Sequence, residues 1–214
     1  MTKPLYIMNE PGITVFEKQA VFDGIQSILI LAKTRKEIVD WGTWNTGTDL
    51  AKQYQSVDWY LEQGRVTSSR SSQLNSETIV NLFLSEPWRQ QQDHYDILIT
   101  HQDLYFRNTN FVIGSAIPHV GTLISTHRFR ELNRRTMHEC IKTEVIHEVG
   151  HVFGLPNQER KDTRESLGQH CTNVCIMRQG LIVPRDWINM TNDRIKYGPL
   201  CGNCQTDLLN YFQK

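Results

Sequence analysis

The chain has 214 residues, 39% of them hydrophobic and 21% charged, which is ordinary for one globular domain with a real core. Lysine plus arginine and aspartate plus glutamate number 23 each, and this neutral balance removes the electrostatic argument for nucleic acid or an anionic membrane as the main partner. The amino terminus does not form a signal peptide, and no apolar run is long enough to span a bilayer, so we expect a cytoplasmic protein.

The amino-terminal half predicts alternating strands and helices. The apolar run 25–31 favours a strand buried on both faces, because only Gln26 and Ser27 interrupt it. Residues 42–75 are polar and predict mainly loop, and Pro87 predicts a break within a helix. The expected elements are a strand at 5–8, a helix at about 15–24, a strand at 25–31, a short element at 57–61 and a helix at about 76–90.

Three short strands and one long helix are expected next. The helix covers about 132–153, where Gly154 and Pro156 end it, and the chain beyond is expected to be mostly irregular. The strands are placed at 96–100, 111–114 and 121–125. One face of the helix carries apolar residues spaced for burial against a sheet, namely Met137, Ile141, Val145, Val149 and Val152. This order of elements predicts an α/β or α+β fold with one mixed sheet.

An HExxH motif, formed by His147, Glu148 and His151, lies within the long predicted helix. Side chains four apart on a helix are offset by about 6 Å along the axis and roughly 40° around it, so both imidazoles can meet one ion. Glu148 can take a proton from a water that zinc acidifies and return it to a leaving amine. The alternative is a surface helix that carries these residues by chance. The amphipathic context and the glycine three residues after His151 favour the metal site.

A third metal ligand is needed, because a catalytic zinc usually has three protein ligands and a water. Metzincin peptidases take it from a histidine six residues after the second one, and Asn157 occupies that position here. The next histidine is His170, which we favour because histidine is the better zinc ligand and Cys171 follows it directly. The alternatives to His170 are Asn157, Glu159, Asp162 and Glu165.

Four of the five cysteines lie in the last 44 residues as two close pairs, Cys171 with Cys175 and Cys201 with Cys204. Disulfides are rare in the cytoplasm, so close pairs favour a shared metal, and four thiolates make a plausible tetrahedral set. Inert buried thiols are the weaker alternative, since this region is short of apolar residues. Cys140 stands alone and is interpreted as a small core residue.

Five segments resemble, in the same order, those of the archaemetzincin family, and together they cover about 70–204. Residues 167–177 resemble the family's segment with the third zinc histidine, two cysteines and the methionine beneath the metal. Residues 201–204 are similar to its final CxxC pair. The other similar segments are 99–105, 111–116 and 124–128.

The resemblance implies a metzincin-like twisted five-stranded sheet packed on an active-site helix, with an edge strand at 111–116 that aligns the substrate backbone. It also implies that Glu148 is the general base and that Met177 lies in the turn beneath the catalytic metal. The implied ligands of a catalytic zinc are His147, His151 and His170. The implied ligands of a second, structural zinc are Cys171, Cys175, Cys201 and Cys204.

Three features depart from the family pattern. The third histidine is displaced by 13 residues, from 157 to 170. The first cysteine pair is separated by three residues, where the family usually has four, and the stretch between Met177 and Cys201 is longer than usual. The first departure is the reason that the alternatives to His170 stay open.

The sequence therefore predicts a zinc metallopeptidase, a hydrolase with two zinc ions and a peptide or protein substrate. Residues 1–214 are expected to form one domain, with the sheet and active-site helix in 1–154 and a zinc-binding region in 155–214. One alternative is a catalytically inactive, zinc-stabilised peptide-binding protein of the same fold, and another is a zinc hydrolase of a non-peptide amide. Glu148 favours an enzyme, because a purely structural zinc has no need of a general base.

Overall fold

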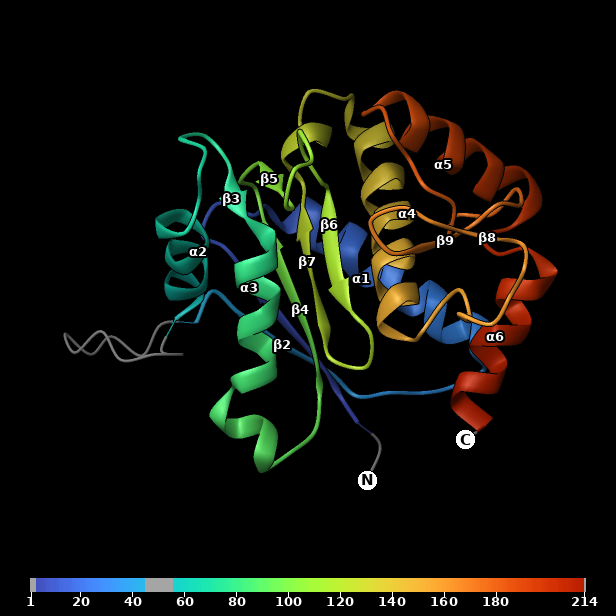
Figure 1. The fold of residues 1–214 in the computed structure, drawn as a ribbon, viewed down its shortest axis with the longest axis horizontal. Coiled ribbons are helices and arrows are strands. Elements are labelled where there is room, and N and C mark those ends of the chain that lie inside the picture. Colours follow the sequence, from blue (N-terminus) through green and yellow to red (C-terminus); the bar gives the residue numbers. More distant parts are fainter. Residues whose placement is uncertain (1–2, 45–55, 214) are drawn as a thin grey trace. The chain divides into compact units, whose positions relative to one another are not determined.

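The computed structural model describes residues 3–44 and 56–213 (Figure 1), so the part of the predicted loop at 45–55 lies outside the described residues. Two compact units make up the chain: one of Met1–Thr14 and Lys36–His127, the other of Val15–Arg35 and Arg128–Lys214. None of the helices in the described ranges has both the length and the apolar composition of a bilayer span. The division into regions 1–154 and 155–214 stays a prediction.

The first unit contains a five-stranded mixed sheet with the order β2-β1-β4-β7-β6. Four of these strands are parallel, and β6 pairs antiparallel with β7 at one edge. Every residue of β4 is buried, which agrees with its central apolar residues 97–99. The strands are β1 (Leu5–Asn9), β2 (Ile38–Gly42), β4 (Tyr95–Thr100), β6 (Gly114–Ile117) and β7 (Gly121–Ser125).

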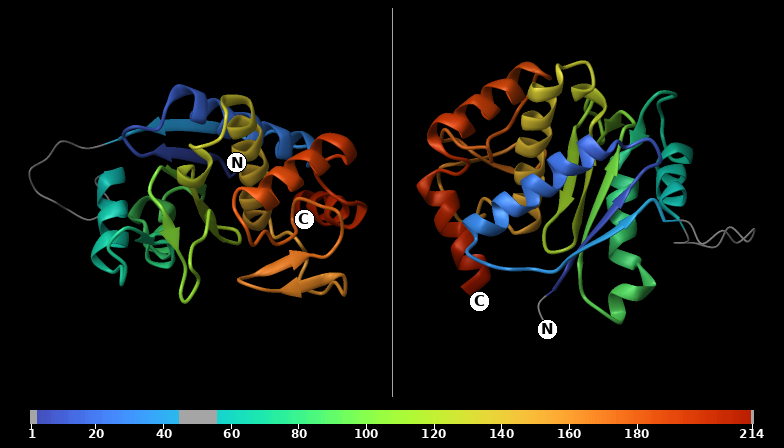
Figure 2. Two further views of the ribbon diagram at one scale, coloured as in Figure 1. Left: turned by 90° about the horizontal axis from the view of Figure 1, so that it is seen from above. Right: turned by 180° about the vertical axis from the view of Figure 1, so that it is seen from behind.

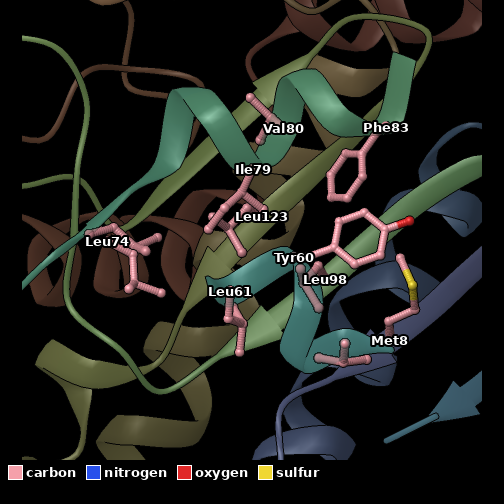
Figure 3. Close-up of a cluster of buried hydrophobic side chains, with 11 residues drawn as sticks. Met8, Tyr60, Leu61, Leu74, Ile79, Val80, Phe83, Leu98 and Leu123 are labelled. Atoms are coloured by element: carbon pink, nitrogen blue, oxygen red, sulfur yellow. The ribbon is translucent and has the colours of Figure 1, made fainter. Parts of the chain in front are cut away.

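Two short helices, α2 (Val57–Val66) and α3 (Ser76–Leu82), share one hydrophobic cluster with the sheet (Figure 3). In that cluster Tyr60 and Phe83 are fully buried. A Cβ on Gly64 would lie 2.5 Å from Cδ1 of Ile79, so the glycine allows the two helices to approach closely. The remaining short elements of this unit are β3 (Leu74–Asn75), β5 (Leu104–Tyr105), and the 3-10 helices η1 (Phe83–Ser85) and η2 (Pro87–Gln90).

The second unit is mainly helical. Helix α1 lies against α4 (Figure 2), and a Cβ on Gly24 of α1 would come within 2.7 Å of the Val145 side chain. Arg130 also donates two hydrogen bonds to the buried carboxylate of Glu17 on α1. The elements are α1 (Val15–Leu31), α4 (Arg134–Val152), β8 (Thr163–Glu165), β9 (Gln169–Cys171), α5 (Arg185–Tyr197) and α6 (Gly202–Gln213). The 3-10 helix η3 (His127–Phe129) lies where the chain passes between the units.

Several predictions are confirmed. These include the α/β fold class with a five-stranded mixed sheet, the long motif helix, and the strands at 5–8, 96–100 and 121–125. The strand predicted at 25–31 is wrong, because this run is the second half of α1. Its buried residues Ile25, Ile28 and Leu29 have helical spacing, and a short apolar run does not by itself separate a buried helix from a buried strand.

Other boundaries also differ. The region after the motif helix is not mostly irregular, since α5 and α6 occupy much of it. The edge strand begins at Gly114 instead of 111, because Val112 forms an isolated bridge with Leu104. The helix expected over 76–90 ends at Leu82 and is followed by two 3-10 turns, the second of which starts at Pro87.

Candidate functional site

Three histidines come together in the second unit. His147 and His151 lie one turn apart on α4, and His170 comes from strand β9. One ring nitrogen from each lies within 4.8 Å of the others, and Nε2 of His147 is 3.1 Å from Nε2 of His151. The ring centroid of His170 lies 5.4 Å from that of His147 and 5.0 Å from that of His151. The imidazoles therefore face one common point.

A backbone carbonyl fixes each ring. Nδ1 of His147 lies 2.6 Å from the carbonyl oxygen of Ile176, and Nδ1 of His151 lies 2.7 Å from that of Leu155. Nδ1 of His170 lies 2.9 Å from the carbonyl oxygen of Gly168. A carbonyl oxygen can only accept, so each Nδ1 carries the proton and each Nε2 keeps its lone pair for a metal. Three convergent imidazole nitrogens suit zinc.

Burial keeps these imidazoles neutral. Desolvation, followed by the nearby His170, lowers the pKa of His147 to about 3. Desolvation and then the neighbouring His147 hold the pKa of His151 well below its usual value. Burial also lowers the pKa of His170. Neutral imidazole is the form that binds a metal ion, so the electrostatics agree with the ligand geometry.

The end of α4 shapes the site. Gly154 has a φ of 76°, and the N–H of Leu155 donates to the carbonyl of Gly150, so the chain turns back sharply and Leu155 meets His151. A Cβ on Gly150 would lie 2.5 Å from Sδ of Met177, a fully buried side chain. The structure thus brings Met177 directly against the motif helix, and its predicted place beneath a metal stays a prediction.

Two carboxylates accompany the histidines on α4. Glu148 is buried, with 6% of its surface exposed. Glu144, one turn earlier, is buried and accepts a hydrogen bond from Nε1 of Trp187 on α5. Burial, opposed by that hydrogen bond, raises the pKa of Glu144 to about 7. Sequence reasoning missed Glu144, although its position four residues before Glu148 was a signal that the two share a helix face.

The inserted segment is the stretch between the motif helix and His170. Among the described residues, His170 joins the histidine group, and the alternative ligands Asn157, Glu159, Asp162 and Glu165 do not. The side chain of Asn157 accepts from the backbone N–H of Glu159, and the backbone N–H of Asn157 donates to Asp207. The carboxylate of Asp162 accepts hydrogen bonds from the guanidinium of Arg160. Strands β8 and β9 pair antiparallel, so the segment turns back on itself, and β9 carries His170 to the other two histidines. The ligand role of His170 still stays a prediction.

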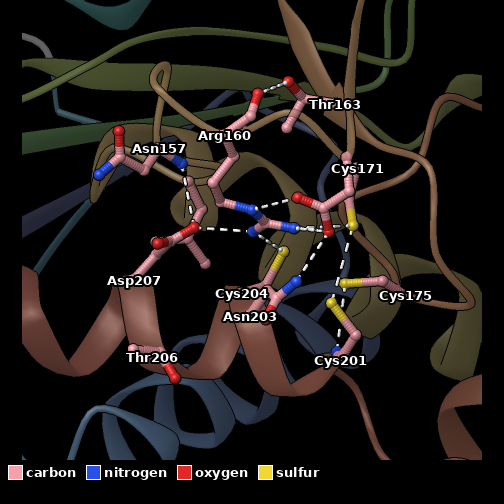
Figure 4. A network of polar contacts seen from close by, with 12 residues as sticks. Asn157, Arg160, Thr163, Cys171, Cys175, Cys201, Asn203, Cys204, Thr206 and Asp207 are labelled. Atoms are coloured by element: carbon pink, nitrogen blue, oxygen red, sulfur yellow. Dashed lines mark hydrogen bonds and ion pairs between the residues drawn. The ribbon is translucent and has the colours of Figure 1, made fainter.

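The four paired cysteines form a second group. The sulfur atoms of Cys171, Cys175, Cys201 and Cys204 all lie within 4.8 Å of one another, and Cys171 Sγ is 3.7 Å from Cys201 Sγ. The side chains are free thiols, three of them buried (Figure 4). Hydrogen bonds from the thiols of Cys175 and then Cys204 hold the pKa of Cys171 well below its usual value. Four convergent sulfurs fit a tetrahedral zinc.

A third group, Glu86, His94 and Asp96, lies buried in the first unit. Nε2 of His94 is 3.1 Å from Glu86 and 3.2 Å from Asp96, and Nδ1 of His94 contacts the carbonyl of Gln92. Arg89 donates to Asp96 as well. Because the imidazole nitrogens are both engaged and a guanidinium is already present, this cluster is an internal ion network and offers no open metal position.

No family model matches the chain, but curated proteins are similar to it in sequence. The archaemetzincin of Nanoarchaeum equitans is 37% identical over 112 residues, which cover 52% of this chain and 51% of that relative. The matches to the first three curated relatives span 51%, 61% and 61% of their lengths.

Crystal structures share the fold. Archaemetzincin from Methanopyrus kandleri superimposes with a TM-score of 0.69 at 18% identity, covering 99% of this chain and 96% of the other. A zinc-dependent peptidase from Methanocorpusculum labreanum superimposes with a TM-score of 0.53 at 18% identity, covering 95% and 99%. At these identities the likeness concerns the fold alone.

Proposed function

We propose that the chain is a zinc-dependent peptidase of the archaemetzincin family, to whose members it is similar in sequence and in fold. In this proposal His147, His151 and His170 bind the catalytic zinc and Glu148 is the general base. The observation that carries it is the convergence of three neutral imidazoles, each fixed by a backbone carbonyl, beside a carboxylate on the same helix.

Each side chain has a task in this reaction. When bound, zinc supplies a Lewis acid that polarises the scissile carbonyl and acidifies a water. Glu148 takes the proton of that water and hands it to the departing amine, so one carboxylate works first as base and then as acid. The carbonyls of Ile176 and Leu155 hold the rings of His147 and His151 in the required tautomer and orientation.

The cysteine group supports a second zinc of structural character. Its four sulfurs come from β9, from the turn that follows and from the start of α6. A metal there would join these segments, and such sites contribute folding free energy directly. We therefore propose two zinc ions per chain, with a peptide or protein as substrate. The cytoplasmic location stays a prediction.

Incubation of the protein with a peptide mixture in water enriched with the heavy isotope of oxygen tests this function. The zinc-loaded protein should generate new carboxyl termini that carry one heavy oxygen, detected by mass spectrometry. A chelator should stop the reaction and added zinc should restore it. Peptides that are retained by the protein but recovered intact would favour the binding-protein alternative. Cleavage of small non-peptide amides without any peptide product would favour the other hydrolase.

A further inference from the structure

We propose that Arg160 and Asn173 form a hydrogen-bonding shell around the cysteine site, and that this shell sets how tightly the site holds its metal. The inference rests on the proposed structural zinc and assigns residues that the HExxH and cysteine patterns do not reveal. Arg160 is the main component, because its guanidinium contacts two of the four sulfurs at once (Figure 4).

Every sulfur of the group accepts at least one N–H. Nη1 of Arg160 lies 3.2 Å from Cys204 Sγ and Nη2 lies 3.5 Å from Cys171 Sγ. Nδ2 of Asn173 lies 3.5 Å from Cys171 Sγ and 3.6 Å from Cys201 Sγ. The remaining sulfur, on Cys175, accepts from the backbone N–H of Cys201 at 3.4 Å.

Two carboxylates hold the guanidinium in place. Nε of Arg160 donates to Asp162 at 2.8 Å, and Nη1 donates to Asp207 at 2.7 Å. Asp162 also accepts from the amides of Asn173 and Asn203. Since both carboxylates share the positive charge, Arg160 acts on the thiolates through directed N–H donation and not by neutralising the site. Its side chain is only 13% exposed, so water competes little for these donors.

The two donors come from the parts of the chain with unusual spacing. Arg160 belongs to the segment that separates the motif helix from His170, and Asn173 lies between Cys171 and Cys175. The inserted segment thus reaches the cysteine group directly, and Thr172 ties it further by donating to the carbonyl of Asp162. This assigns the segment a role at the metal site.

The physical effect is on the metal-bound thiolates. An N–H donated to a thiolate stabilises the negative charge of the sulfur in the position that it occupies as a ligand. Loss of such an outer partner typically lowers metal affinity by about 10- to 100-fold. The shell should therefore slow the loss of this zinc without providing a ligand itself.

The test measures zinc transfer to a chromophoric chelator from the full-length zinc-loaded protein. Arg160→Gln should release the cysteine-bound zinc about 10- to 100-fold faster than wild type, and Arg160→Lys should restore part of the difference. Asn173→Ala should show a smaller acceleration, and it keeps the Arg160 ion pairs if the arginine variants fold poorly. Arg130→Gln is the matched control, because it removes a two-bond arginine–glutamate pair that is not part of the cysteine group.

Cobalt gives a second readout. In protein loaded with Co²⁺, the thiolate charge-transfer band should change energy in Arg160→Gln and stay at the wild-type position in Arg130→Gln, which a merely structural role would not produce. If wild type binds two zinc ions but the Arg160 and Asn173 variants release zinc at the wild-type rate with an unchanged band, this inference is wrong. If wild type has no cysteine-bound zinc, the structural-site proposal fails and the inference fails with it.

Discussion

His170 belongs to the histidine group while its neighbour Cys171 belongs to the cysteine group. Strand β9 therefore serves two candidate metal sites at once, and the backbone N–H of Cys171 donates to the carbonyl of Met177, which closes the turn between them. His170 was predictable as a ligand because histidine is the better zinc ligand and Cys171 follows it directly, whereas the metzincin spacing alone indicates Asn157. The hydrogen bonds of Glu144 with Trp187 and of Arg160 with Cys204 could not be predicted, because each joins residues more than 40 positions apart.

Replacing His170 should separate the two metals. His170→Ala removes one of three imidazoles and should severely weaken the histidine-bound zinc while the cysteine-bound ion stays. Asn157→Ala is the control and should leave both ions in place, because its side chain accepts a local hydrogen bond from Glu159. Elemental analysis of the purified variants measures this. A loss of zinc in the asparagine variant alone would transfer the ligand role to Asn157.

At the scale of elements, the motif helix, the central strands and the first half of α1 were predictable, and the second half of α1 was not. The helix α4 and strand β4 follow their apolar patterns closely. Residues 25–31 contain enough apolar residues for a buried strand, and the packing of Gly24 and Ile28 against α4 is a long-range contact that the sequence does not show. Helices α5 and α6 were missed because each buries only two or three residues, which leaves a short apolar pattern in a polar sequence.

The cysteine group should stabilise the elements that carry it. Changing Cys201 and Cys204 to serine should remove one zinc ion and lower the melting temperature, because structural zinc contributes folding free energy. Cys140→Ser is the matched control, since this buried cysteine belongs to neither metal group. Elemental analysis and thermal unfolding measure both effects. Two retained ions and an unchanged melting temperature in the double variant would contradict the structural site.

The ion network of the first unit should make stability depend on pH. Burial opposes protonation of His94, but hydrogen bonds with Asp96 and Glu86 raise its pKa to about 9. The pKa of His94 in the folded state lies above the unfolded value near 6.5. The contribution of protonated His94 to the free energy of unfolding is therefore complete below about pH 6.5 and is lost as pH rises through about 9. Its upper limit is on the order of 3 kcal/mol.

Denaturant unfolding at several pH values measures this contribution. The free energy of unfolding of wild type should fall between pH 6.5 and 9 relative to that of His94→Gln, which lacks the titrating group. Tyr6 stacks on His94 and Arg89 faces Asp96, so both should be left intact in this comparison. Parallel pH curves for the two proteins would show that His94 is not the group responsible.

On the scale of the whole molecule, all the predicted ligands belong to the second unit, whereas the five-stranded sheet belongs to the first. The sequence predicted the fold class through the order of its motifs and strands. It could not predict the division into units, because α1 is close in sequence to β1 yet packs with α4. Contacts between residues more than a hundred positions apart, such as Arg130 with Glu17, leave no local pattern.

The most direct test of the proposed mechanism compares peptide hydrolysis and zinc content in wild type and Glu148→Ala. Glu148 is the proposed base and not a ligand, so the variant should keep both zinc ions and lose hydrolysis by at least about 100-fold, the usual contribution of a general base. Matched zinc content shows that the loss comes from the missing proton transfer. Cleavage by the variant at the wild-type rate, with zinc in place, would contradict the assignment of Glu148 and with it the proposed mechanism.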